Sequence, residues 1–155
     1  MSEELPSEYL DRFSGVARLY GAGALPRLLN AHIAVIGLGG VGSWTAEAIA
    51  RSGIGNITLI DLDEVCVTNV NRQLPAHDRN VGRFKVNAVA DRLKLINPKV
   101  VIHEEVAFFN EKNADDILGR DFDCIVDAIV DVKQKSFLIA TCRDRKLSLV
   151  VAGGA

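Results

Sequence analysis

The sequence predicts an α/β fold with a Rossmann-like, mostly parallel sheet and helices on both of its faces. Two observations predict this class. Short apolar runs rich in β-branched residues alternate with amphipathic helical patterns over most of the 155 residues, as in a series of βαβ units. A glycine-rich turn, GLGGVG at residues 37–42, joins the first apolar run to the first helical pattern. We expect residues 1–31 to form an N-terminal helical arm and residues 32–155 to form one Rossmann-like domain.

The hydrophobic spacing places each element in turn. The apolar run at residues 33–36 predicts a strand that is buried on both faces. Alanines at helical spacing predict a helix at residues 44–52, and an amphipathic helix at 81–96 stops at Asn97-Pro98. The other predicted strands are residues 56–60, 100–106, 122–129 and 147–152. The other predicted helices are residues 111–118 and 132–146, with helical spacing also in residues 5–19 and 25–29.

The carboxyl ends of these strands should meet at one edge of the sheet, because parallel strands point the same way. Ligands of doubly wound sheets bind at that edge. The residues expected there are Gly37–Gly42, Asp61–Asp63, Ala107–Asn110, Asp127–Asp131 and Gly153–Gly154.

The glycine turn is typical of a nucleotide site. Gly37, Gly39 and Gly42 give G-x-G-x-x-G, with Gly40 as an extra glycine. Such a turn lets the backbone approach a phosphate, whose charge then meets the N–H groups of a helix N-terminus. Asp61 closes the second strand and is placed to accept hydrogen bonds from ribose hydroxyls. The turn alone also serves packing, and it does not distinguish NAD, FAD, S-adenosylmethionine and ATP.

A polar, irregular segment follows Asp61. Residues 62–85 are too many for a plain connection of about 2–6 residues, and Arg72 within them can bind phosphate oxygens in a bidentate way. The alternative is an ordinary surface arginine. Lys85 falls in the first turn of the following helix, where a cation opposes the helix dipole. An anion is therefore expected beside it, unless the lysine is simply solvated. The polar side chains gathered here are Asn69, Asn71, Arg72 and Gln73.

Composition excludes several classes of function. The net charge is −2, so no global basic field indicates nucleic-acid binding. No apolar run approaches the ~20 residues of a membrane span, and the acidic N-terminus lacks a signal peptide's apolar region, so we expect a cytoplasmic protein without membrane contact. The three cysteines (Cys66, Cys124 and Cys142) are far apart and form no C-x-x-C pair. They predict reduced, packed residues, and no complete protein metal site.

Several motifs together resemble the ubiquitin-activating-like adenylating superfamily, which also includes the bacterial enzymes that activate sulfur carriers. They are GLGGVGSW, LIDLD, V-x-x-x-N-x-x-R-Q, G-x-x-K and INP. Within this superfamily, RFSGVARLYG, VCVTNVNRQ and CRDRK look most like the tRNA threonylcarbamoyladenosine dehydratases. The resemblance covers nearly the whole chain and implies the ATP-binding half of the adenylating-enzyme fold.

The resemblance implies a role for each matching residue. Gly37–Gly42 would hold the ATP phosphates and Asp61 would bind the ribose. Asn69, Arg72 and Lys85 would contact the phosphates, and the two cations would offset charge as pyrophosphate departs.

The resemblance also implies a reaction and partners. ATP would activate the threonyl carboxylate of N6-threonylcarbamoyladenosine in a tRNA anticodon loop, and loss of AMP would close the side chain into a cyclic form. Relatives are homodimers in which an arginine of the arm enters the partner subunit's site, and Arg12 and Arg18 are the candidates. A sulfur-relay protein is a further candidate partner.

Two departures from the family pattern predict impaired chemistry. The family motif D-A-I-D, whose second aspartate helps to bind Mg²⁺, reads Asp127-Ala128-Ile129-Val130 here. Asp131 is one residue too late on regular backbone, although a local shift would restore it as the catalytic carboxylate. Relatives also continue well past residue 155, so the domain is expected to be truncated at its C-terminus.

Three alternatives stay open. The first is an adenylating enzyme for a ubiquitin-like sulfur carrier, although the two C-x-x-C pairs frequent in such relatives are absent. The second is a non-catalytic nucleotide-binding remnant, which Val130 favours. The third is an NAD-binding oxidoreductase, which would leave Asn69, Arg72 and Lys85 without a role.

Overall fold

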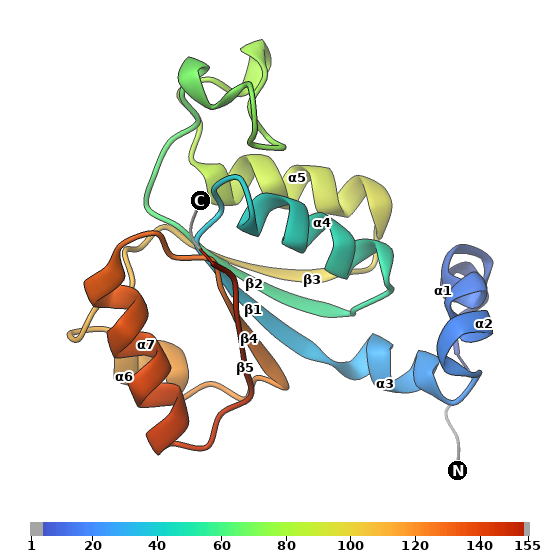
Figure 1. Ribbon diagram of the computed structural model, residues 1–155. Coiled ribbons are helices and arrows are strands. Elements are labelled where there is room, and N and C mark those ends of the chain that lie inside the picture. Colours follow the sequence, from blue (N-terminus) through green and yellow to red (C-terminus); the bar gives the residue numbers. More distant parts are fainter. Residues whose placement is uncertain (1–4, 154–155) are drawn as a thin grey trace.

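The computed structural model describes residues 5–153 and has a five-stranded, all-parallel sheet at its centre (Figure 1). The strand order is β3-β2-β1-β4-β5. Gly154, expected at the ligand-binding edge, and Ala155 lie outside the described residues. The strands are β1 (His32–Ile36), β2 (Asn56–Ile60), β3 (Val101–Glu105), β4 (Cys124–Asp127) and β5 (Leu149–Val151). All five fall within or beside the predicted strands.

Two helices cover each face of the sheet, as predicted (Figure 1). One face carries α4 (Gly42–Arg51) and α5 (Lys85–Ile96), and the other carries α6 (Ala114–Leu118) and α7 (Val132–Asp144). Each pair closes its own apolar core over the sheet. The fully buried residues at the centres of these two cores include Val35, Leu59, Val89 and Leu93 on one face, and Ala34, Ile125, Leu138 and Cys142 on the other.

The N-terminal arm is helical but interrupted. It consists of α1 (Ser7–Phe13), the 3₁₀ turn η1 (Ser14–Val16), α2 (Ala17–Tyr20) and α3 (Ala24–Asn30). Tyr9 and Phe13 are buried in a small core of the arm's own. The hydroxyl of Tyr9 donates a hydrogen bond of 2.8 Å to the carbonyl of Gly53, just before β2. The arm is thereby fastened at the amino ends of the strands, opposite the expected ligand edge (Figure 1).

The helix predicted at residues 81–96 begins four residues later, at Lys85. Gly82 has φ +85°, a left-handed conformation that ends regular structure. The backbone of Arg83 accepts a hydrogen bond from the N–H of Val65, and the N–H of Lys85 donates to the carbonyl of Asp63. The segment before α5 is therefore irregular, as predicted, with short 3₁₀ turns η2 (Val67–Asn69) and η3 (Asp78–Asn80).

The sheet reverses its order of connection at β1, which lies between β2 and β4. At the carboxyl edge, Ile36 of β1 is in register with Ile60 of β2 and with Asp127 of β4. The turn after β1 therefore opens between the two neighbouring strand ends. A crevice at such a point is the ligand position in doubly wound sheets. Among the described residues, no helix is long and apolar enough to cross a membrane.

Candidate functional site

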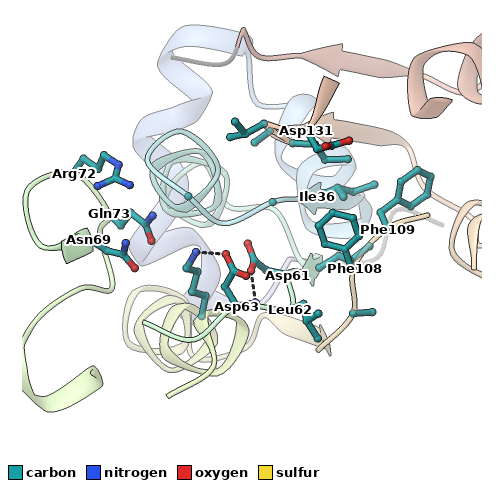
Figure 2. Close-up of a pocket in the computed structure, with 18 residues that line it drawn as sticks. Ile36, Asp61, Leu62, Asp63, Asn69, Arg72, Gln73, Phe108, Phe109 and Asp131 are labelled. Carbon is teal, nitrogen blue, oxygen red and sulfur yellow. Dashed lines mark hydrogen bonds and ion pairs between the residues drawn. The ribbon is translucent and has the colours of Figure 1, made fainter. Parts of the chain in front are cut away.

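A cavity of about 340 Å³ lies at the carboxyl edge of the sheet. Segments far apart in the sequence line it (Figure 2). They are Gly37 and Gly39 of the glycine turn, Asp61–Asp63 after β2, Asn69, Arg72 and Gln73 of the irregular segment, Lys85, Ala107–Phe109 after β3, and Ala128–Asp131 after β4. Every predicted strand-end group within the described residues contributes to it except the one after β5.

Close packing explains two of the four site glycines. Gly37 has φ +91°, and a Cβ there would lie 2.7 Å from the carbonyl oxygen of Ala128. A Cβ on Gly42 would lie 1.7 Å from the carbonyl oxygen of Gly37. Gly42 therefore lets the first turn of α4 rest directly on the end of β1. Gly40 and Gly42 are not among the residues that line the cavity.

Unpaired backbone donors gather at the head of α4. The N–H of Leu38 donates to Asp61 Oδ2 at 2.6 Å. Within residues 5–153, the next four N–H groups, of residues 39–42, have no hydrogen-bond acceptor. Free N–H groups at a helix N-terminus form a binding site for anions.

Asp61 ties the glycine turn to the end of β2. Its Oδ2 accepts from Leu38, and its Oδ1 accepts from the N–H of Asp63 at 2.8 Å. Each carboxylate oxygen has more than one lone pair, so the half-buried carboxylate can still accept from a ligand hydroxyl. The ribose contact of Asp61 stays a prediction.

Arg72 stands at the mouth of the cavity with an exposed side chain (Figure 2). Its Nη1 donates to the carbonyl of Thr68 at 3.2 Å and to Asn71 Oδ1 at 3.0 Å. Neither partner is charged, so the guanidinium remains available to an anion. Asn69 is buried, and its Oδ1 accepts from the N–H of Cys66 at 2.9 Å. Asn69 thus shapes the loop that presents Arg72.

Lys85 is buried, which rules out the alternative of a simply solvated lysine. Its side chain is 6% exposed, and its Nζ lies 2.9 Å from Asp63 Oδ2. The anion expected beside the first turn of α5 is therefore supplied in this structure by Asp63. The ammonium still lines the cavity, so a stronger anion can compete for it.

The position of the family's second aspartate carries no ligand atom, because Val130 is 72% exposed and apolar. Asp131 nevertheless lines the cavity, as the N-cap of α7 (Figure 2). Its Oδ1 accepts from the N–H of Gln134 at 2.8 Å, which leaves Oδ2 unused. Asp127 is fully buried and pairs with Lys135 Nζ at 2.7 Å. No group of three or more His, Cys, Asp or Glu side chains in the described chain could hold a metal alone.

Gln73 and Phe108 line the cavity, although the sequence analysis assigned neither of them a role; Phe108 falls within the strand end 107–110 expected there. Gln73 is 7% exposed, and Phe108 after β3 is 49% exposed although it is aromatic. Gln73 was noted within the polar run but had no role assigned. The place of Phe108 directly after the third predicted strand was the signal that put it at the ligand edge.

Other predicted residues lie away from the cavity. Arg12 and Arg18 are exposed on the N-terminal arm and are absent from the lining. All three cysteines are free, but Cys66 is exposed, which corrects the expectation that all three are packed. A hydrogen bond from the hydroxyl of Thr68 to Cys66 Sγ lowers the pKa of that thiol.

Known proteins are similar to nearly the whole chain. The profile of the ThiF family matches residues 13–155. The tRNA threonylcarbamoyladenosine dehydratase of Haemophilus influenzae is 50% identical over 147 residues, which are 95% of this chain and 56% of that protein. The Escherichia coli protein of the same name is 47% identical over 155 residues, covering 100% of this chain and 58% of that protein.

Solved structures give the same picture. The crystal structure of the E. coli dehydratase, TcdA, in complex with ATP has a TM-score of 0.96 and 47% identity, covering 98% of this chain and 63% of that chain. Its complex with AMP also has a TM-score of 0.96. The chain thus spans somewhat more than half the length of the relatives it matches.

Proposed function

The chain belongs to the ThiF family, and from that premise we propose that it uses ATP to adenylate the threonyl carboxylate of N6-threonylcarbamoyladenosine in tRNA. Loss of AMP would then allow closure to the cyclic, dehydrated form. One observation carries the proposal: the glycine turn, Asp61, Arg72 and Lys85 converge on one cavity. That cavity lies in a fold similar to a dehydratase crystallised with ATP and with AMP.

The chemistry requires activation of a carboxylate, which is a poor electrophile. A carboxylate oxygen attacks the α-phosphorus of ATP, the bond from that phosphorus to the bridging oxygen breaks, and pyrophosphate leaves with the electron pair. Negative charge grows on the leaving group, so cations placed beside it lower the barrier. Arg72 and Lys85 would supply that charge, and Asn69 would keep the arginine's loop in position.

Each part of ATP has a matching surface in the cavity. Asp61 would accept hydrogen bonds from the ribose hydroxyls. The free N–H groups of residues 39–42 would receive the phosphates. Phe108 and Leu62 supply an apolar wall (Figure 2), which suits the face of an adenine ring.

Asp131 is the residue that would bind Mg²⁺ with the nucleotide. Mg²⁺ in nucleotide sites takes one or two carboxylates together with phosphate oxygens and water, and Asp131 has one carboxylate oxygen without a partner in the described chain. A bound Mg²⁺ would neutralise phosphate charge. Asp131 would hold the ion in place of the missing aspartate at Val130, while its other oxygen caps α7.

We further propose a homodimer in which Arg12 or Arg18 enters the partner subunit's cavity. Both arginines are exposed on an arm fastened at the amino ends of the strands, opposite their own chain's cavity. A second subunit is therefore the site they can reach. Residues 1–31 would act as this arm and residues 32–155 as the ATP-binding domain. A cytoplasmic location and a sulfur-relay partner complete the proposal.

The experiment supplies the chain with ATP, Mg²⁺ and tRNA that carries N6-threonylcarbamoyladenosine, with the unmodified tRNA as control. We expect AMP and pyrophosphate release only with the modified tRNA, and loss of one water from the modified nucleoside by mass spectrometry. AMP release only with a ubiquitin-like sulfur carrier would favour the second adenylating function. ATP binding without any AMP release would indicate a non-catalytic nucleotide-binding domain.

A further inference from the structure

The carboxamide of Gln73 has no partner although it is buried beside the glycine turn. The residue is 7% exposed, and its Oε1 is sealed from solvent without a donor. Its Nε2 is not among the sealed atoms; it lies beside Gly39, in the cavity wall (Figure 2). A buried carbonyl oxygen without a donor is unfavourable, so Oε1 of Gln73 does not stabilise the fold.

The backbone of Gln73 is held over the turn from both sides. The indole Nε1 of Trp44 donates to the carbonyl of Arg72 at 3.0 Å. The N–H of Leu74 donates to Ser43 Oγ at 3.2 Å. Both anchors belong to the first turn of α4, so two hydrogen bonds tie the loop to the head of that helix. The side chain of Gln73 is thereby directed at the free N–H groups of the turn.

Three successive residues of the turn, 38–40, each face a different side chain. The carboxylate of Asp61 accepts a hydrogen bond from the N–H of Leu38. A Cβ added to Gly39 would lie 3.9 Å from Nε2 of Gln73. A Cβ added to Gly40 would lie 3.5 Å from Cγ of Arg72. Ribose, α-phosphate and β-phosphate follow one another covalently in ATP. With the ribose at Asp61, the α-phosphate meets Gln73 and the β-phosphate meets Arg72.

We propose that Gln73 is the ligand of the α-phosphate, donating from Nε2 to one of its non-bridging oxygens. This inference rests on the proposed function, because it takes the ribose position from Asp61. The α-phosphorus is the atom attacked in adenylation, and its oxygens remain negative while the carboxylate bonds to it and pyrophosphate leaves. A fixed amide donor there orients the phosphorus for attack and adds no charge that would hold back the product AMP.

The test compares adenosine, AMP and ATP binding by calorimetry for the whole chain and for Gln73→Met, without Mg²⁺. Loss of one hydrogen bond to a charged group should raise the Kd of AMP and ATP by about ten- to a hundred-fold, with adenosine affinity unchanged. Gln73→Glu keeps the shape and places a negative charge at the phosphate. It should weaken AMP binding at least as much, and it carries the test if the methionine variant does not fold.

Gln134→Met is the matched control. Gln134 also has a buried Oε1 without a donor, but it lies on α7 and does not line the cavity. It should leave all three affinities unchanged. Unchanged AMP affinity in both Gln73 variants would overturn the assignment, as would equal loss of adenosine affinity, which would indicate a collapsed cavity. A wild-type chain that binds none of the three ligands would instead overturn the proposed function.

Discussion

Lys85 Nζ lies 2.9 Å from Asp63 Oδ2, with the lysine buried and the aspartate largely exposed. The pair joins the first turn of α5 to the loop after β2. A nucleotide triphosphate carries several negative charges, so it can replace one exposed carboxylate as the partner of this ammonium. Asp63 thus keeps the ammonium of Lys85 at the cavity, and the phosphates of a nucleotide can displace it.

Replacing Lys85 with methionine keeps the aliphatic stem and removes the charge. We expect the Kd of ATP to rise about ten- to a hundred-fold, measured by calorimetry. Asp63→Asn is the matched change on the other side of the pair. It should bind ATP at least as tightly as the wild type, because the lysine loses its competitor. Weaker ATP binding in Asp63→Asn would show that the aspartate itself serves the ligand.

Arg72→Ala should separate ATP from AMP. The aliphatic stem of Arg72 packs beside Gly40, and we place its guanidinium at the β-phosphate. Its loss should therefore weaken ATP binding about ten- to a hundred-fold and leave AMP binding intact. The side chain is exposed, and the unfolding free energy should change by less than about 0.5 kcal/mol. Arg79→Ala removes another exposed arginine that does not line the cavity and should change neither affinity. Equal loss of AMP and ATP binding would contradict the assigned order.

Val130→Asp restores a carboxylate at the rim of the cavity. We expect Mg²⁺-dependent ATP turnover to rise by about tenfold, because a second carboxylate strengthens Mg²⁺ coordination beside the phosphates. Val132→Asp is the control, since Val132 is 76% exposed but does not line the cavity. No gain in Val130→Asp, together with loss in Asp131→Asn, would show that Asp131 already fills the role.

Gly42→Ala tests the contact between α4 and β1. The new methyl would overlap the carbonyl oxygen of Gly37, and neither backbone can move without opening the turn. We expect destabilisation of about 3 kcal/mol or more, read from urea unfolding. Gly15→Ala, which has no heavy atom within 4 Å of its added Cβ, should stay within about 0.5 kcal/mol of the wild type. A stable Gly42→Ala protein would show that the turn is softer than its packing indicates.

Glu47 gives the fold a dependence on acid. Burial raises the pKa of Glu47, but hydrogen bonds from Arg92 and Arg51 outweigh burial and lower it below 4.5. The stabilisation is therefore complete above about pH 5 and is lost as the pH falls through the lower, folded-state pKa.

We expect Glu47→Gln to lower the free energy of unfolding by about 1–2 kcal/mol at pH 7. The effect is modest because both arginine side chains are partly exposed. The difference from wild type should shrink toward pH 3, as urea titrations at several pH values would show. A constant difference across this range would mean that the carboxylate charge contributes nothing.

The periodic elements were predictable because their packing follows simple rules. Buried parallel strands give unbroken apolar runs, so β1 and β2 appear where the sequence predicts them. The glycine turn and Asp61 also share one cavity as expected, because the order of a βαβ unit dictates it. The start of α5 was placed too early because Val81 extends the helical pattern. The left-handed backbone of Gly82 prevents the helix from starting there.

The unpredicted parts of the site depend on contacts between distant segments. Nothing in the helical pattern of α5 indicates that Lys85 is buried against Asp63, 22 residues earlier. The unpaired amide of Gln73 is equally invisible, because a missing hydrogen bond has no sequence pattern. Phe108 was expected at this edge of the sheet, but the sequence did not indicate that its ring would form a half-exposed wall of the cavity. Such features follow from tertiary packing, which periodicity does not encode.

Trp44 is the chain's single tryptophan, and its indole N–H is bonded to the carbonyl of Arg72. Half of its surface is open to water, so its emission responds to any change in hydration or hydrogen bonding at this point. A movement of the phosphate-facing loop against α4 would stretch or break this hydrogen bond. Trp44 is therefore an intrinsic fluorophore at the contact between α4 and the loop that carries Arg72. Loop movement on nucleotide binding can be timed by stopped-flow fluorescence without a label.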